Sequence, residues 1–162
     1  MPKSFAGGLE AQTRTRVVDL LNGLLADAVA LTLATKEAHW NLKGPGFIGV
    51  HELLDDVADR LREGADLIAE RAVVLGGLAK GTLESVAAGS RVEPYPSDAV
   101  DIQDHLRALV ERFEGVGARL REGIDAADEA GDADTADVLT EVSRAVDKDA
   151  WFIGANLPPR EQ

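Results

Sequence analysis

Histidine and carboxylate residues recur at helical spacing in the first half of the chain. His51 and Asp55 are one helical turn apart, Asp66 and Glu70 repeat that spacing, and His39 precedes both pairs. In a chain without cysteine, any metal must be held by such imidazole nitrogens and carboxylate oxygens. Taken alone, a His–Asp pair at this spacing is more often a surface ion pair than a metal site. The positions of both pairs around the helix distinguish these two interpretations.

The two pairs lie on one face of the helix that carries them. At about 100° per residue, the step from Asp55 to Asp66 advances only about 20° beyond three turns. The large apolar residues of this helix centre roughly 90° to one side of His51, whereas the candidate ligands spread over about 100° on the other side. The pattern predicts that the ligands point out of the core.

One chain cannot complete a metal site from these residues. Asp55 and Asp66 are about 16 Å apart along the helix axis, whereas metal–ligand bonds are about 2.0–2.2 Å long. A second copy, antiparallel across a two-fold axis near residue 60 or 61, would bring His51 and Asp55 to the partner's Asp66 and the partner's Glu70. This arrangement predicts two equivalent sites roughly 22 Å apart.

Small residues and one arginine accompany this stripe. Ala58, Ala65 and Ala69 flank it and would let two helix backbones approach closely. Arg62 lies on the stripe and could pair with a partner carboxylate between the two sites. The alternative interpretation is a solvated acidic face.

The elements that must position these residues are helices. Aromatic residues make up only 4% of the chain, and strand-type alternation is hard to find. The apolar periodicity, with its Gly and Pro interruptions, predicts long helices and one short helix within a long crossover; their approximate ranges are 9–39, 47–75, 82–88 (short), 102–120 and beyond, and 134–156. The prediction is an all-α, ferritin-like four-helix bundle with a short extra helix between helices two and three, in one domain over residues 1–162.

Composition excludes several classes of function. Without cysteine there is no disulfide scaffold, thiolate metal site or cysteine nucleophile. A net charge of −12 argues against phosphate backbones and anionic lipid as partners and favours cations. The N-terminus has no signal-peptide core, and the apolar stretch 20–34 is interrupted by Asn22 and Asp27. We therefore expect a cytoplasmic protein without membrane contact.

The order of these residues resembles one protein family. The stretch His39-Trp40-Asn41, then Gly44, His51, Asp55-Asp56, Asp66, Glu70 and Gly76-Gly77, is similar to the Dps family (DNA-binding protein from starved cells), the bacterial mini-ferritins. The similarity extends over nearly the whole chain, including residues 134–137 and 147–153. This resemblance implies a four-helix subunit assembled as a hollow homo-dodecamer with tetrahedral symmetry.

The resemblance also implies a ferroxidase centre at each two-fold interface. One subunit would supply His39, His51 and Asp55, and its neighbour would supply the partner's Asp66 and the partner's Glu70, as iron ligands and catalytic residues. In the family, hydrogen peroxide is the preferred oxidant of Fe(II), oxygen reacts more slowly, and ferric mineral collects inside the cage, which limits oxidative damage. Trp40 would adjoin the centre, either to accept a stray oxidising equivalent or to pack at the interface.

The join between the last two helices is crowded with acidic residues: Asp125, Asp128, Glu129, Asp132, Asp134 and Asp137. N-capping explains Asp132 or Asp134 but does not require six acids. By resemblance, the segment lines three-fold pores: Asp128 and Asp137 match pore carboxylates, Ala133 stands where another is often found, and Asp132 or Asp134 could compensate.

His105 has no motif match and is predicted to be structural or on the surface, while Trp151 and Phe152 are predicted to pack in the core or at an interface.

Three functions remain open at this point: an iron-oxidising storage enzyme, a DNA-compacting protein, and a structural cage whose stripe only makes interfacial hydrogen bonds. DNA binding by such cages depends on basic terminal tails. Here Lys3, Arg14 and Arg16 are accompanied by Glu10, and Arg160 is followed by Glu161. DNA binding is therefore predicted to be weak or absent, with nucleoid association only if it is retained.

Overall fold

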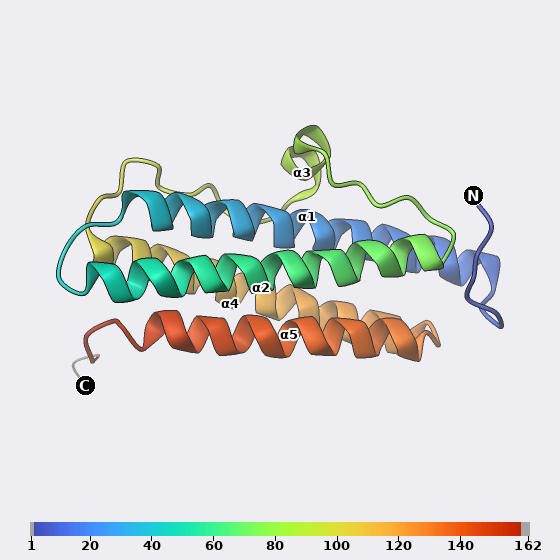
Figure 1. Ribbon diagram of the computed structural model, residues 1–162. Coiled ribbons are helices and arrows are strands. Elements are labelled where there is room, and N and C mark those ends of the chain that lie inside the picture. The colour runs from blue at the N-terminus through green and yellow to red at the C-terminus, as the bar shows by residue number, and fades with distance from the viewer. Residues whose placement is uncertain (1, 160–162) are drawn as a thin grey trace.

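The computed structural model describes residues 2–159, and it is built from helices (Figure 1). They are α1 (Ala11–Asn41), α2 (Phe47–Val74), α3 (Leu83–Gly89), α4 (Ile102–Glu129) and α5 (Ala133–Gly154). The described residues contain no β-strand, only an isolated bridge between Lys43 and Asp101. The all-α prediction, with four long helices and a short one in the crossover, is confirmed.

The four long helices run side by side, and α3 lies outside them against α1 (Figure 1). α1 packs mainly on α2 and α4 mainly on α5, and the two pairs meet through α1 with α4 and α2 with α5. The crossover returns the chain along the length of the bundle, so that α4 begins beside the end of α1. Two backbone hydrogen bonds hold this junction: Lys43 N donates to Val100 O, and Ile102 N donates to Lys43 O.

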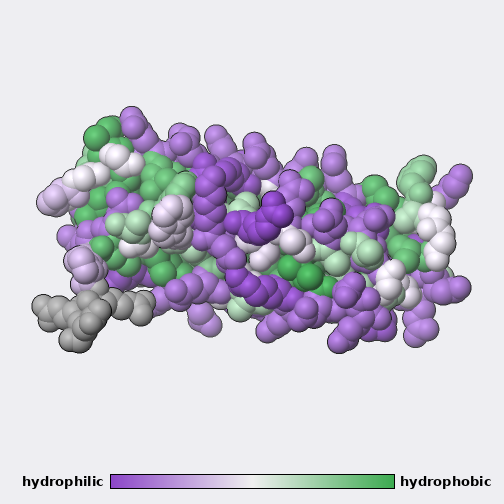
Figure 2. All heavy atoms as spheres, turned by 90° about the horizontal axis from the view of Figure 1, so that it is seen from below, coloured by the Kyte–Doolittle hydropathy of each residue, from purple (hydrophilic) through white to green (hydrophobic). Residues whose placement is uncertain are grey.

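Each long helix contributes one apolar stripe to the core. On α2, Val50, Leu54, Val57, Leu61 and Ile68 are all buried, as their periodicity predicts. The surface seen from below in Figure 1 is largely hydrophilic, with apolar patches between the charged side chains (Figure 2). On the outward side of α2, Asp55, Asp66 and Glu70 are exposed.

The apolar character of α1 belongs to the core as well. Its length and composition would suit a membrane span, but 61% of its most apolar window is buried inside the bundle. Asp27, which interrupts this window, is fully buried, and its carboxylate oxygen Oδ2 lies 2.9 Å from both Arg91 Nη2 and Arg119 Nε. These ion pairs fasten the crossover and α4 to α1.

Gly76 and Gly77 end α2 as predicted. Gly76 adopts a φ of 85°, and its backbone N–H donates to Val73 O while that of Gly77 donates to Ala72 O. A Cβ atom on Gly76 would lie 2.8 Å from Pro2 O, so the N-terminal segment can pass close to this turn only because the residue is glycine.

Three side chains refine the predictions made from sequence. His105 is buried and its Nδ1 lies 2.7 Å from Tyr95 Oη, which confirms the structural alternative, and burial lowers the pKa of His105. Trp151 is 67% exposed, and its ring is tilted by 45° against that of Phe152, so the core alternative was wrong for Trp151 and an interface remains its predicted place. Ala58 is fully buried against its own bundle and does not line the outer face.

Candidate metal centre

The end of α1 and the beginning of α2 bring two histidines together. The rings of His39 and His51 are stacked, with centroids 3.8 Å apart. Nδ1 of each ring lies 2.8 Å from the backbone carbonyl oxygen of the other residue. Because a carbonyl oxygen only accepts, both Nδ1 atoms must donate, and each neutral ring keeps the lone pair on Nε2. This is the tautomer that a metal ligand needs.

Asp55 lies next to these rings and is ionised. Its Oδ1 is 4.0 Å from His39 Nε2 and 2.5 Å from Lys36 Nζ. The hydrogen bond from Lys36 lowers the pKa of Asp55, assisted by the positive charges of Lys36 and Arg62. His39 therefore lies between the carboxylate of Asp55 and the stacked ring of His51.

Lys36 is a candidate site residue that the sequence analysis did not identify. It precedes His39 by three residues, so the two side chains share a face of α1. Lys36 Nζ also lies 5.7 Å from the centroid of the Trp40 ring, which is 65% exposed. Trp40 thus lies beside Lys36, and its place at the centre, with either a redox role or interface packing, stays a prediction.

Asp66 and Glu70 are exposed on the same outward stripe of α2, further along the helix. The outward orientation that their spacing predicts is confirmed. Within one subunit, residues 2–159 contain no group of three or more His, Asp or Glu side chains arranged to hold a metal. The shared ligand set of His39, His51, Asp55, Asp66 and Glu70 therefore remains a prediction about two subunits.

Asp66 borders an apolar groove rather than an evenly charged surface. The groove has a volume of about 510 Å³ and runs between α1 and α2. Arg62 is part of its lining, which is otherwise mainly apolar and includes Leu25, Val29, Leu33, Ala65, Ala69 and Ala79. An apolar groove beside the candidate ligand Asp66 favours a subunit contact over a fully solvated face.

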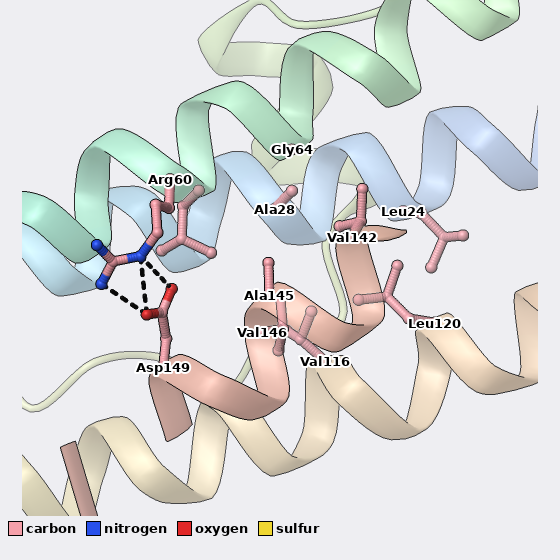
Figure 3. A pocket seen from close by; sticks show the side chains of 11 residues that line it. Leu24, Ala28, Arg60, Gly64, Val116, Leu120, Val142, Ala145, Val146 and Asp149 are labelled. Carbon is pink, nitrogen blue, oxygen red and sulfur yellow. Dashed lines mark hydrogen bonds and ion pairs between the residues drawn. The ribbon is translucent and has the colours of Figure 1, made fainter. Parts of the chain in front are cut away.

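The bundle interior holds a small cavity of about 20 Å³, lined almost entirely by apolar side chains of the long helices (Figure 3). At one end, Arg60 pairs with both carboxylate oxygens of the buried Asp149: Nη2 and Nε donate to Oδ1 at 2.7 and 2.9 Å, and Nε also donates to Oδ2 at 3.3 Å. A cavity of this size holds about one water molecule. It offers no inward carboxylate cluster of the kind that larger di-iron bundles use.

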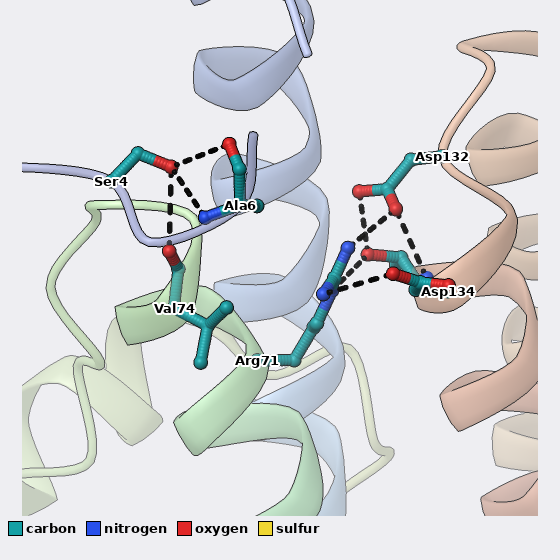
Figure 4. A network of polar contacts seen from close by, with 7 residues as sticks. Ser4, Ala6, Arg71, Val74, Asp132 and Asp134 are labelled. Carbon is teal, nitrogen blue, oxygen red and sulfur yellow. Dashed lines mark hydrogen bonds and ion pairs between the residues drawn. The ribbon is translucent and has the colours of Figure 1, made fainter. Parts of the chain in front are cut away.

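The acidic turn contains one structural and several exposed carboxylates (Figure 4). Asp132 is the N-cap of α5, accepts from Thr135 N at 3.1 Å, and lies 2.6 Å from Arg71 Nη2. Only 1% of Asp132 is exposed, which corrects its prediction as a pore carboxylate and confirms its capping role. Asp128, Asp134 and Asp137 are exposed and remain the pore candidates.

Comparisons with known proteins agree with this architecture. The ferritin-like domain family matches residues 18–158. A DNA protection during starvation protein from Agrobacterium fabrum is 48% identical over 149 residues, which cover 92% of each chain. The Dps structure from Mycobacterium smegmatis has a TM-score of 0.92 at 33% identity and covers 98% of this chain and 96% of that one. A Microbacterium arborescens Dps structure in the high iron form has a TM-score of 0.83 at 33% identity, covering 90% and 95%. The resemblance read from the sequence is thus confirmed, and the chain belongs to the Dps family of ferritin-like proteins.

Proposed function

We propose that this protein is a ferroxidase that oxidises Fe(II) with hydrogen peroxide at centres shared by two subunits. The ferric product is stored in a hollow homo-dodecamer in the cytoplasm, where oxidative damage is thereby limited. The observation that carries this proposal is the stacked His39–His51 pair, in which both Nδ1 atoms contact backbone carbonyls and His39 Nε2 lies 4.0 Å from the ionised Asp55. Membership of the ferritin-like family and the high iron form of the relative from Microbacterium arborescens support iron as the substrate.

The ligands divide between two subunits by position. His39, His51 and Asp55 form one half-site, and the partner's Asp66 and the partner's Glu70 form the other. Three carboxylates and two neutral imidazoles bind Fe(II) and stabilise the more highly charged Fe(III) further, so the site favours oxidation. Entering Fe(II) must compete with the Lys36 ammonium for Asp55.

The proposed reaction consumes two Fe(II) ions for each molecule of hydrogen peroxide. Two Fe(II) each give up one electron, the O–O bond of hydrogen peroxide breaks, and two protons complete two water molecules. Because one peroxide receives both electrons, no hydroxyl radical is released. Oxygen is a slower oxidant in this proposal.

Iron enters the cage through three-fold pores, where the exposed carboxylates of Asp128, Asp134 and Asp137 attract the cation.

Two double variants test the shared centre. His51→Ala/Asp55→Ala should abolish rapid Fe(II) oxidation by peroxide, followed by near-ultraviolet absorbance, while the cage still assembles, because the ligands add metal affinity rather than packing. Asp66→Ala/Glu70→Ala should do the same. When the two variants are disassembled and reassembled together, each mixed interface collects all defects in one site and leaves its twin intact.

Oxidation should therefore return in mixed cages. Unchanged rates in the first double variant would refute the centre. Verified mixed cages without any recovery would show that the ligands do not come from two chains. An Asp104→Ala variant, which removes an exposed carboxylate from α4, serves as the control and should oxidise Fe(II) normally.

A further inference from the structure

An exposed ion pair lies on α2 midway between the two proposed half-sites. Arg62 Nη1 donates to Asp59 Oδ1, and the two side chains are 54% and 68% exposed. An exposed pair three residues apart on a helix contributes little to the stability of a single chain. Asp59 and Arg62 nevertheless lie within about 30° of the middle of the stripe that carries the candidate ligands.

The proposed two-fold arrangement determines what faces this pair, and the inference rests on that arrangement. His51 opposes the partner's Glu70, and Asp55 opposes the partner's Asp66. In both cases the residue numbers add up to 121, so the axis crosses α2 between residues 60 and 61. In the same register, Asp59 opposes the partner's Arg62, and Arg62 opposes the partner's Asp59.

The outward face of α2 needs a cation at this place. It carries Glu52, Asp55, Asp56, Asp59, Glu63, Asp66 and Glu70, of which Asp55 pairs with Lys36 and Asp59 with Arg62. Two copies of this acidic face would repel each other across the axis. The other two arginines of α2 are directed elsewhere: Arg60 pairs with Asp149 and Arg71 pairs with Asp132. Arg62 is therefore the cation of α2 that remains available to a second copy of this chain.

We propose that Asp59 and Arg62 form a charge lock that aligns two copies of α2 at the two-fold axis. Four charges alternate around the axis, and each Arg62 lies between its own Asp59 and the partner's Asp59. The lock offsets the repulsion between the acidic faces before iron binds. It also holds the register in which each half-site meets its complement.

Charge reversal tests the lock. Asp59→Arg places four guanidinium groups at the axis, and Arg62→Asp places four carboxylates there, so each variant alone should pair with itself about 10- to 100-fold more weakly than the parent chain. Mixed together, the two variants regain opposite charges across the axis. Native mass spectrometry of the reassembled dimers should then show mixed pairs well above the half that random pairing gives. The reversed double variant Asp59→Arg/Arg62→Asp should pair with itself as the parent does.

A matched pair on another helix is the control. Arg107 Nη2 lies 2.7 Å from Asp104 Oδ1 on α4, with both side chains similarly exposed and the same spacing of three residues. Asp104→Arg and Arg107→Asp should mix at random in the two-fold dimer. Random mixing of the Asp59 and Arg62 variants, or a reversed double variant that pairs poorly, would overturn the lock. Recovery of oxidation in the complementation experiment without charge-directed pairing would refute the lock alone, whereas failure of both experiments would refute the two-fold arrangement itself.

Discussion

At the scale of single residues, backbone carbonyls orient the rings of His39 and His51, and Lys36 forms an ion pair with Asp55. The reciprocal Nδ1 contacts hold His39 and His51 in one orientation, so no rearrangement of the rings is needed to expose Nε2. Lys36 neutralises Asp55 at 2.5 Å in the chain without iron. Because its hydrogen bond lowers the pKa of Asp55, the carboxylate's contribution to stability is present above the ordinary value of 3.8 and is lost as the pH falls through the lowered pKa.

We expect Lys36→Gln to raise the pKa of Asp55 towards 3.8, since it removes the largest cause of the shift. At pH 7 Asp55 stays ionised, and Fe(II) should bind about two- to tenfold more tightly because a competing positive charge is gone. NMR titration of the Asp55 carboxyl carbon and equilibrium Fe(II) binding under nitrogen measure the two effects. Lys43→Gln, at an exposed lysine of the α1–α2 connection, should change neither. Weaker Fe(II) binding in Lys36→Gln would show that the ammonium positions Asp55 for the metal.

At the scale of helices, one buried ion pair joins α2 to the beginning of α5. Arg71 and Asp132 are almost fully buried, and the same carboxylate caps α5 through Thr135 (Figure 4).

Asp132→Ala should lower the free energy of unfolding by about 3–5 kcal/mol, because it leaves the Arg71 charge buried without its partner and removes the cap. Denaturant titration followed by circular dichroism measures this loss. Asp134→Ala is the matched control: its exposed carboxylate is 3.8 Å from the same Arg71, and its removal should cost under about 0.5 kcal/mol. Equal losses in the two variants would contradict the role given to Asp132.

At the scale of the whole molecule, charge and the fixed N-terminus oppose DNA binding. With a net charge of −12 per subunit, the proposed dodecamer would carry about −144. The N-terminal segment is held against the end of α2, where Phe5 N donates to Val74 O at 2.9 Å. Arg14 and Arg16 belong to α1 itself, so Lys3 is the only cation that precedes this helix within the described residues. Arg160 and Glu161, the remaining tail charges considered from sequence, lie outside the described residues.

We therefore expect no retention of duplex DNA by sub-micromolar cages at pH 7 and about 150 mM salt, because counterion release supplies most of such binding. A gel-shift titration measures it. The same chain with an added N-terminal run of lysines is the control that should bind, since twelve weak tails act together. Retention of DNA by the unmodified chain would restore the DNA-compacting function as a candidate.

Much of the fold and the outer half of the site could be predicted from the sequence, because both depend on the angle between residues of one helix. A period of 3.6 places Asp55, Asp66 and Glu70 on the face opposite the core stripe, and Gly76 marks the end of α2 by its backbone conformation. The same period placed Ala58 close to the outer stripe, where the structure instead buries it. The helical period gives the direction in which a side chain points, but it does not say how much of the helix surface the neighbouring helices cover.

Only the tertiary structure decided which side chains meet between helices. The carbonyl contacts of His39 and His51, the pairing of Lys36 with Asp55, and the pairing of Arg71 with Asp132 each join different helices. Such contacts depend on how two helices are rotated and shifted against each other, and many rotamers of a long lysine or arginine satisfy the same sequence pattern. For this reason the sequence determined which residues of this protein face outward, and packing alone selected the partners that set their charge and orientation.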